Sequence, residues 1–291
     1  MKQFIKKKFC SKNQTTKELH IVNVGVSIIT NYERNNKENL NYEELLKGDI
    51  KDKKIYEFVQ NNPEANSAEL NAILKKIRSD NEKDEKVKKE YYFYFVGTNT
   101  PKCRLCVKII KKILEDKKDW YILNPENKEI PGYYMEEAIV YEQFKEGISN
   151  LLEHLIKLIE NNKDKYDKIY LNPTGGYKPH VIATAVAGFL TECDLYYLNE
   201  DFTQIITLPS LIYIPKENEI KVLKEICPNI NERTPITDPT QIQELEKKYG
   251  KDLLKKLKNF YLIDCEYDER DGRLFRIQIS KKGQLLLKNL P

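Results

Sequence analysis

The stretch "YLNPTGGYKPHVI", residues 170–182, joins a strand-like apolar run to a helix of small residues. Gly175 and Gly176 let the backbone approach a ligand closely and expose consecutive N–H groups, and the helix after them directs its positive end to the same place. Lys178 adds a mobile positive charge and Thr174 adds a hydroxyl. The stretch therefore predicts a phosphate-binding turn, with a glycine-rich turn beside a solvated lysine as the alternative.

Strands and helices alternate on both sides of this turn, and most of the strands are continuous apolar runs. Such a pattern predicts an α/β fold with a Rossmann-like, mainly parallel sheet covered on both faces. Ser67 is expected to cap one helix, and Pro101 suits the first turn of another. The predicted strands are residues 19–25, 90–100, 119–125 and 166–176, with a strand and hairpin at 194–209, and the predicted helices are residues 66–77, 101–114, 135–162 and 178–193.

The alternation stops near residue 215, and the C-terminal residues have a different pattern. Two short helices, two strands around the acidic turn "DERDG" and a last helix form the order of a winged helix-turn-helix. The predicted domains are a polar N-terminal arm at 1–17, an α/β domain at 18–214 and a winged helix-turn-helix-like domain at 215–291.

The balance of charged residues indicates that any phosphate binding depends on a local site rather than on a widely basic surface. The 291 residues include 49 basic and 45 acidic side chains, a net charge of +4. This balance gives no wide electrostatic footprint for nucleic acid. No apolar run is long enough to cross a bilayer and the N-terminus lacks a signal peptide's apolar core, so we expect a cytoplasmic protein without a membrane partner.

Metal and cofactor signals are weak. Cys103 and Cys106 form a CxxC with no second pair at ligand spacing, which favours reduced, partly buried thiols over a zinc site. The three histidines of the chain are too separated to form a metal site. Neither GxxxxGK[ST] nor a GxGxxG after a strand is present, which argues against ATP hydrolysis and nicotinamide chemistry. We therefore expect no metal and no cofactor.

Three motifs carry a resemblance to a known family. "NVGVSIITN" after the first strand, "NSAELNAI" in the following helix and "NPTGGYKPH" after the fourth strand resemble those of CARF domains, the cyclic oligoadenylate sensors of type III CRISPR systems. The chain is most similar to the standalone ring nucleases that carry a C-terminal winged helix. The resemblance covers residues 18–214 through these motifs and the remainder by architecture. Tyr177 stands where the family usually has threonine.

The resemblance implies a homodimer whose two-fold axis passes through a ring-shaped ligand, usually cyclic tetra-adenylate. It implies metal-independent cleavage to linear di-adenylate with 2′,3′-cyclic phosphate ends, which switches the antiviral signal off, with Ser27 and Lys178 as the catalytic residues. The remaining ligand-binding residues are expected in the turns after the strands: Gly25, Asn31, Thr98, Asn99, Thr174, Gly175, Gly176 and Tyr177.

Two other functions stay open at this point. The chain is alternatively a DNA-binding regulator that responds to the ring, or a sensor that binds the ring without cleaving it. The predicted wing, "DCEYDERDGR" at 264–273, is acidic. Because a DNA-binding wing lies against the phosphates of the DNA backbone, these acidic residues disfavour DNA as a partner.

Three further groups of side chains have predicted roles near the turns. Glu69 is expected to be structural, capping a helix or pairing with a lysine. His180 is expected to be a helix residue rather than a general base. Tyr133 and Tyr134 lie in a loop that is placed to fold over the ligand.

Overall fold

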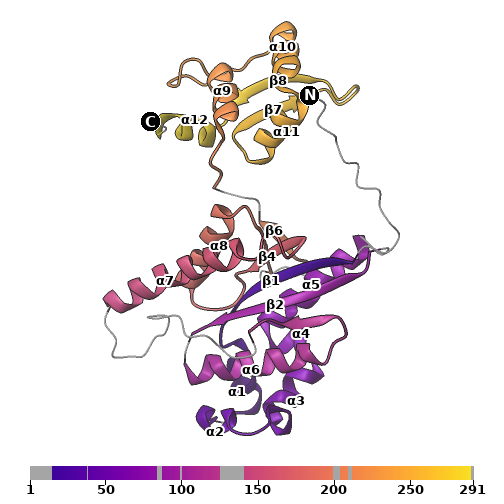
Figure 1. Ribbon diagram of the computed structural model, residues 1–291, viewed down its shortest axis with the longest axis vertical. Helices are drawn as coiled ribbons and strands as arrows, with labels where there is room; N and C mark the ends of the chain where they lie inside the picture. The colour runs from indigo at the N-terminus through magenta and orange to yellow at the C-terminus, as the bar shows by residue number, and fades with distance from the viewer. Residues whose placement is uncertain are drawn as a thin grey trace. The chain divides into compact units, whose positions relative to one another are not determined.

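The computed structural model describes residues 15–37, 39–83, 87–98, 100–124, 141–198, 204–208 and 212–289. Asn99, Tyr133 and Tyr134, together with most of the predicted N-terminal arm, lie outside the described residues. The chain divides into two units, Met1–Ser210 and Leu211–Pro291 (Figure 1).

The first unit is built on a six-stranded sheet in the order β3-β2-β1-β4-β5-β6. All neighbouring strands pair in parallel except β5 and β6, which are antiparallel. The predicted α/β class with a Rossmann-like, mainly parallel sheet is thus confirmed. The strands are β1 (Thr16–Val24), β2 (Lys89–Gly97), β3 (Trp120–Ile122), β4 (Lys168–Asn172), β5 (Asp194–Tyr197) and β6 (Ile206–Leu208).

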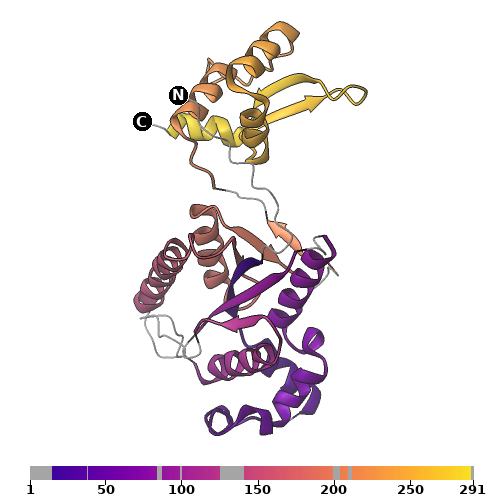
Figure 2. The same ribbon diagram turned by 45° about the vertical axis from the view of Figure 1, so that its right-hand side comes forward.

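Helices connect these strands and cover both faces of the sheet. The connection from β1 to β2 contains α1 (Ser27–Asn36), α2 (Tyr42–Leu46), a 3₁₀ turn (Ile50–Asp52), α3 (Lys54–Asn61), α4 (Pro63–Asn66) and α5 (Ala68–Lys83). The later connections contain α6 (Pro101–Glu115), α7 (Tyr141–Glu160) and α8 (Lys178–Leu190). In Figures 1 and 2, α7 and α8 lie on the opposite side of the sheet from α5 and α6.

The alternation of side chains in β1 explains why both faces need cover. Val22 and Val24 point into the core shared with α5 and α6. Asn23, between them, points to the other face, where its side-chain amide donates to Thr184 Oγ1 of α8 at 2.8 Å. A strand that is buried on both faces has an almost unbroken run of apolar residues, and residues 19–25 show this pattern in the sequence.

The chain reverses its direction of winding between β1 and β4. From β1 it proceeds to β2 and β3 on one side, then returns to place β4 on the other side of β1. Open sheets of this kind bind ligands at such a switch point, beyond the carboxyl ends of the strands. The predicted phosphate turn follows β4 at this place.

Helix ends agree with the sequence in two places. Ser67 Oγ accepts the N–H of Leu70 at 3.2 Å, which caps α5 as predicted. Pro101 is the first residue of α6, and Thr100 Oγ1 caps that helix by accepting the N–H of Cys103 at 3.3 Å.

The predictions missed several helices. No helix was predicted between the strand at residues 19–25 and the helix at residues 66–77, but this segment contains α1, α2, α3 and α4. Helices of four to ten residues with many charged side chains show too little apolar periodicity to be recognised, since they form only on packing against α6 and the rest of the unit.

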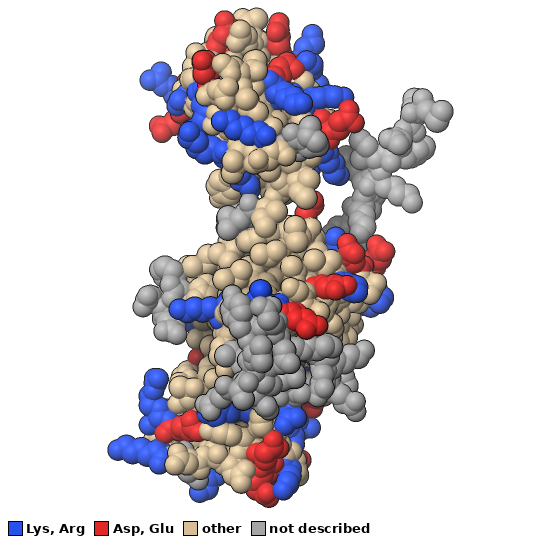
Figure 3. All heavy atoms as spheres, turned by 90° about the vertical axis from the view of Figure 1, so that its left-hand side faces the viewer, with Lys and Arg blue, Asp and Glu red and all other residues tan. Residues whose placement is uncertain are grey.

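The second unit has its own core and its own short sheet. It contains α9 (Glu217–Ile226), α10 (Pro239–Tyr249), α11 (Lys251–Asn259), β7 (Ile263–Tyr267), β8 (Leu274–Ile279) and α12 (Lys281–Asn289), and an isolated bridge joins Ile236 to Ile277. The helix α9 was not predicted. It is fixed at its start by Glu219, which accepts the N–H of Lys216 at 2.7 Å and the hydroxyl of Tyr213. On the face of the chain that Figure 3 shows, acidic and basic side chains are interspersed on the second unit as they are on the first.

Candidate functional site

A cavity of about 250 Å³ opens at the switch point of the sheet. It brings together the ends of β1, β2 and β4 with the first residues of α1 and α5. Its lining consists of Val24, Gly25, Val26, Ser27, Ala68, Glu69, Thr98, Thr174, Gly175, Gly176 and Tyr177.

Most residues predicted for the site line this cavity. The turn after β1 contributes Gly25, and the first residue of α1 contributes Ser27. Directly after β2 comes Thr98, which is buried. The turn after β4 contributes Thr174, Gly175, Gly176 and Tyr177.

Two predicted residues are placed differently. Lys178 is the exposed first residue of α8, beside the cavity rather than in its lining. Asn31 lies inside α1, a full turn beyond Ser27, and its amide donates to Asn66 O at 3.3 Å. Asn31 was expected in a turn, but α1 begins at Ser27 and carries Asn31 toward α4 instead. Its role in binding stays a prediction.

The glycines are required by close contacts between backbones. A Cβ on Gly25 would lie 2.7 Å from Gly176 N, so the end of β1 and the turn after β4 touch directly. Gly176 has a φ of +95°, a conformation that favours glycine. A Cβ on Gly175 would lie 2.2 Å from Glu69 Oε1 and 2.7 Å from Asn23 O. The two turns therefore form one surface over the carboxylate of Glu69.

Glu69 was expected to be structural, by capping a helix or pairing with a lysine, and its contacts are structural but made with other partners. It is 1% exposed at the start of α5, and its carboxylate accepts three hydrogen bonds. Gly25 N donates to Oε1 at 2.8 Å, while the hydroxyls of Ser27 and Ser67 donate to Oε2 at 2.8 and 3.0 Å. Instead of pairing with a lysine, Glu69 joins the first turn to α5 and lies in the floor of the cavity.

The turn after β4 is held by its own polar groups. Asn172 Oδ1 accepts the N–H of Thr174 at 3.0 Å, and Thr174 Oγ1 accepts the N–H of Leu198 at 3.4 Å. These bonds hold the backbone of the turn before any ligand binds. In the bond to Leu198 the Thr174 hydroxyl acts as an acceptor, so that bond does not use its proton.

Tyr177 and His180 belong to the start of α8. The tyrosine ring is 45% exposed and lies edge-on to the imidazole, with ring centroids 5.7 Å apart. His180 is buried, and burial lowers the pKa of its imidazole to about 4. The ring is therefore neutral near pH 7 but only a weak base, and it is buried within α8, as expected for a helix residue rather than a general base.

The predicted CxxC lies within α6. Cys103 and Cys106 are both buried free thiols. Burial raises the pKa of Cys103 to about 11 and that of Cys106 well above its usual value. Within the described ranges, no three His, Cys, Asp or Glu side chains are grouped to hold a metal ion. No helix in those ranges is long and apolar enough to cross a membrane.

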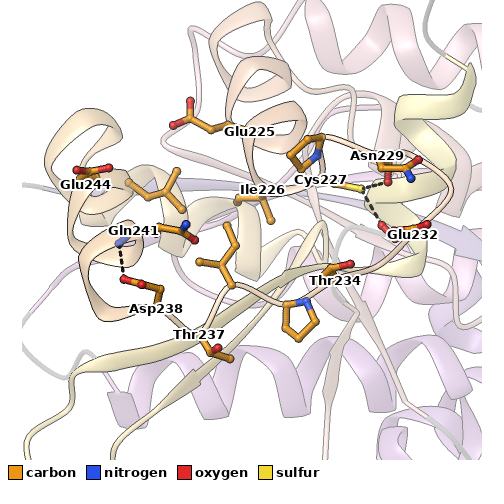
Figure 4. A pocket seen from close by; sticks show the side chains of 14 residues that line it. Glu225, Ile226, Cys227, Asn229, Glu232, Thr234, Thr237, Asp238, Gln241 and Glu244 are labelled. Atoms are coloured by element: carbon orange, nitrogen blue, oxygen red, sulfur yellow. Dashed lines mark hydrogen bonds between the residues drawn. The ribbon is translucent and has the colours of Figure 1, made fainter.

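A larger cavity, about 570 Å³, lies in the second unit between α9 and α10 (Figure 4). Its lining includes the carboxylates Glu225, Glu232, Asp238 and Glu244. Four carboxylates repel an anionic ligand. The smaller cavity at the switch point is therefore the better candidate for binding a ligand that contains phosphate.

The sequence of this chain matches a known protein family. Residues 64–211 match the family described as CRISPR-associated protein (Cas_APE2256), and this match covers just over half of the chain. The chain belongs to this CRISPR-associated family. The matched region contains Glu69, Thr98 and the whole turn from Thr174 to Lys178. The expectation of a CRISPR-associated protein is confirmed.

Three solved structures are similar at low identity. They are Can2 from Sulfobacillus thermosulfidooxidans in complex with cyclic tetra-adenylate (11% identity, 93% of this chain and 63% of that chain, TM-score 0.32), Enterococcus italicus Csm6 bound to cyclic hexa-2′-fluoro-hexa-dAMP (13%, 84% and 54%, 0.33) and protein VC1899 from Vibrio cholerae (8%, 94% and 64%, 0.28). The chain spans 54–64% of the length of these proteins. Its function is therefore argued from its own residues.

Proposed function

We propose that this CRISPR-associated protein binds a cyclic oligoadenylate, cyclic tetra-adenylate in the first place, at the switch-point cavity and cleaves it. The observation that carries the proposal is the meeting of the "NPTGG" turn with Gly25 and Ser27 at the end of β1. The CARF-like motifs and the family membership support the same ligand class.

The phosphates of the ring are best bound on the α8 side of the cavity. Gly176 brings its backbone to the surface there, and the 13-residue helix α8 begins two residues later. The N-terminus of a helix carries partial positive charge and attracts phosphate. Lys178, the exposed first residue of α8, adds a full charge at the same end.

The cavity is too small for a whole ring, which supports a homodimer. Its volume of about 250 Å³ is below the ~300–1,000 Å³ of sites for ordinary small ligands. A cyclic tetranucleotide is larger than such ligands, so one chain holds part of the ring and a second copy holds the rest. A two-fold axis through the ring gives both halves the same contacts.

The surface of α8 supports the same arrangement. Ile182 is 63% and Leu190 46% exposed, with the half-buried Val186 between them. Residues four apart share one helix face, so these three form an apolar stripe on a helix that is apolar nearly all round. A second copy that covers this stripe would bring the two cavities toward one axis.

The proposed reaction needs no metal. A ribose 2′-hydroxyl attacks the adjacent phosphorus and the bond to the 5′-oxygen breaks, which leaves a 2′,3′-cyclic phosphate; two such cuts give linear di-adenylate. Lys178 would stabilise the charge that grows on the phosphoryl oxygens, and Ser27 would fix the sugar. Removal of the ring switches type III CRISPR signalling off.

Incubation of the full chain with radiolabelled cyclic tetra-adenylate in EDTA tests this proposal. We expect linear products, and loss of one charge-stabilising donor in Lys178→Ala should slow cleavage about a hundredfold. Lys165→Ala, which removes an exposed lysine elsewhere in the same unit, is the matched control and should cleave normally. A ring that stays intact but bound would identify a non-cleaving sensor instead.

One observation favours a second candidate, a ring-responsive DNA-binding regulator. A cavity is lined by Lys251, Lys255 and Lys258 of α11 together with Tyr267 of the β7–β8 hairpin. In the expected winged helix, α11 would be the recognition helix and the hairpin its wing. Asp268, Glu269 and Asp271 in the same hairpin oppose it. A duplex titration at two salt concentrations decides, because DNA binding requires an affinity that falls steeply with salt.

A further inference from the structure

The carboxylate of Glu69 fixes the direction of the Ser27 hydroxyl. An ionised carboxylate only accepts hydrogen bonds, so in the 2.8 Å contact between Ser27 Oγ and Glu69 Oε2 the serine is the donor. Ser27 Oγ also accepts the N–H of Ala68 at 3.2 Å. A hydroxyl has one proton and two lone pairs, so Ser27 retains one lone pair and no proton for a ligand.

This hydrogen-bond arrangement selects the part of a nucleotide that meets Ser27. Phosphodiester oxygens are anionic and only accept hydrogen bonds, so Ser27 cannot bind one without losing its bond to Glu69. The buried charge of Glu69, which lies directly beneath, also repels a phosphate at that point. A ribose hydroxyl can donate to the free lone pair. The sugar therefore belongs over Ser27 and the phosphate over the N-terminus of α8.

The other partners of Glu69 keep this direction fixed. Gly25 N donates to its Oε1, and the Ser67 hydroxyl donates to the same Oε2 as Ser27. Ser67 is held in turn by Leu70, whose N–H it accepts at 3.2 Å. The carboxylate cannot swing away without breaking these bonds, and Gly175 packs over it. Glu69 is thus rigidly held within proton-transfer distance of Ser27.

We propose, on the basis of the function proposed above, that Glu69 is the positioning residue of the reaction and the final acceptor of the 2′-hydroxyl proton. As the 2′-oxygen bonds to phosphorus, its proton passes to Ser27 Oγ and the proton of Ser27 passes to Glu69 Oε2. The bond from phosphorus to the 5′-oxygen breaks, and the leaving oxygen takes a proton from the ammonium group of Lys178. Exchange with water then returns both groups to their starting state.

The Glu69→Gln variant separates this role from a structural one. Its amide oxygen still accepts the N–H of Gly25, whereas its NH₂ group donates toward Ser27 and turns the serine proton to the ligand. We expect cyclic tetra-adenylate to bind within about threefold of wild type while the single-turnover cleavage rate falls ~100-fold or more, as when a general base is lost. Glu82→Gln, at an exposed position of the same helix, should change neither.

A second measurement does not depend on cleavage. In the Lys178→Ala background, which slows the reaction, the chain should bind the ribose ring roughly fivefold more tightly than the all-2′-deoxy ring, about the contribution of one hydrogen bond. Adding Ser27→Ala should remove this preference, because the oxygen that accepts the ribose hydroxyl is then absent.

The outcomes separate the two proposals. A Glu69→Gln variant that cleaves at the wild-type rate overturns the proton relay and leaves ring cleavage standing. A wild-type protein that binds the ring without cleaving it overturns the proposed enzyme and the relay together. Equal affinity for the ribose and deoxyribose rings overturns the placement of the sugar over Ser27, whatever the cleavage result.

Discussion

Gly175 illustrates at the residue scale how tightly the site is built. Its Cα lies so close to Glu69 and to the backbone of Asn23 that an added Cβ would come within 2.2 Å of Oε1 and 2.7 Å of the carbonyl oxygen. The side chain of Glu69 is held by three donors and the carbonyl belongs to a central strand, so neither atom moves easily. The glycine is thus needed for space.

We therefore expect Gly175→Ala to lower the free energy of unfolding by about 1–3 kcal/mol, as overpacking does, and to abolish ring binding. Gly48→Ala is the control, because a Cβ there meets no atom within 4 Å and only the positive φ of +73° is strained. Thermal unfolding and calorimetric titration of both variants check this. Wild-type affinity in Gly175→Ala would contradict the described packing.

At this scale the turn residues that line the cavity could be predicted from the sequence, but the side chain of Glu69 that binds them could not. Glycines, a lysine and hydroxyls after apolar runs carry a local signal, and the lining residues Gly25, Ser27, Thr98 and Thr174 to Tyr177 followed from it. Glu69 has no such signal, because its partners Gly25 and Ser27 are more than 40 residues away and become neighbours only when α5 packs against the end of β1.

At the scale of elements, the start of α6 shows how a cap supports the site. Thr100 Oγ1 accepts the N–H of Cys103, and Thr98, two residues earlier, lines the cavity. Thr100→Ala should cost about 1 kcal/mol of stability, the usual effect of losing such a cap, and Thr100→Ser should restore most of it. Chemical denaturation measures both, and an unchanged midpoint in Thr100→Ala would count against the cap.

Helix α8 makes a prediction about pH. Burial lowers the pKa of His180 to about 4, below the usual value of 6.5. Between these two pH values the imidazole is protonated in the unfolded chain and neutral in the folded chain. The stability from the neutral ring is therefore complete above pH 6.5 and is lost as the pH falls toward 4, by at most ~3 kcal/mol. His180→Gln should lose less stability than wild type over this range in urea unfolding at several pH values, and parallel losses would contradict the assignment.

Elements were predicted well where burial on both faces produced long apolar runs. The central strands follow from that pattern, whereas the helices α5, α6, α7 and α8 follow from helical spacing of apolar residues and from residues suited to helix starts. The short helices α2 and α3 and the helix α9 did not, because their stability comes from tertiary contacts and from capping groups such as Glu219 rather than from their own periodicity.

At the scale of the whole molecule, the apolar stripe of α8 predicts how copies associate. Ile182→Glu places a charge in the stripe and should convert a dimer to a monomer while the fold is retained. Leu285→Glu, at a position of α12 that is 62% exposed, is the matched control and should leave the dimer intact. Sedimentation velocity with circular dichroism checks both variants, and a dimer that survives Ile182→Glu would place the interface elsewhere.

The most direct test of the central claim is calorimetric titration of the full chain with cyclic tetra-adenylate. In the proposed arrangement each switch-point cavity holds part of a ring, so we predict a saturable heat with one ring for every two chains, and a loss of that heat in Gly175→Ala. No heat with either the tetra- or the hexa-adenylate ring would contradict the claim that this corner of the sheet binds cyclic oligoadenylate.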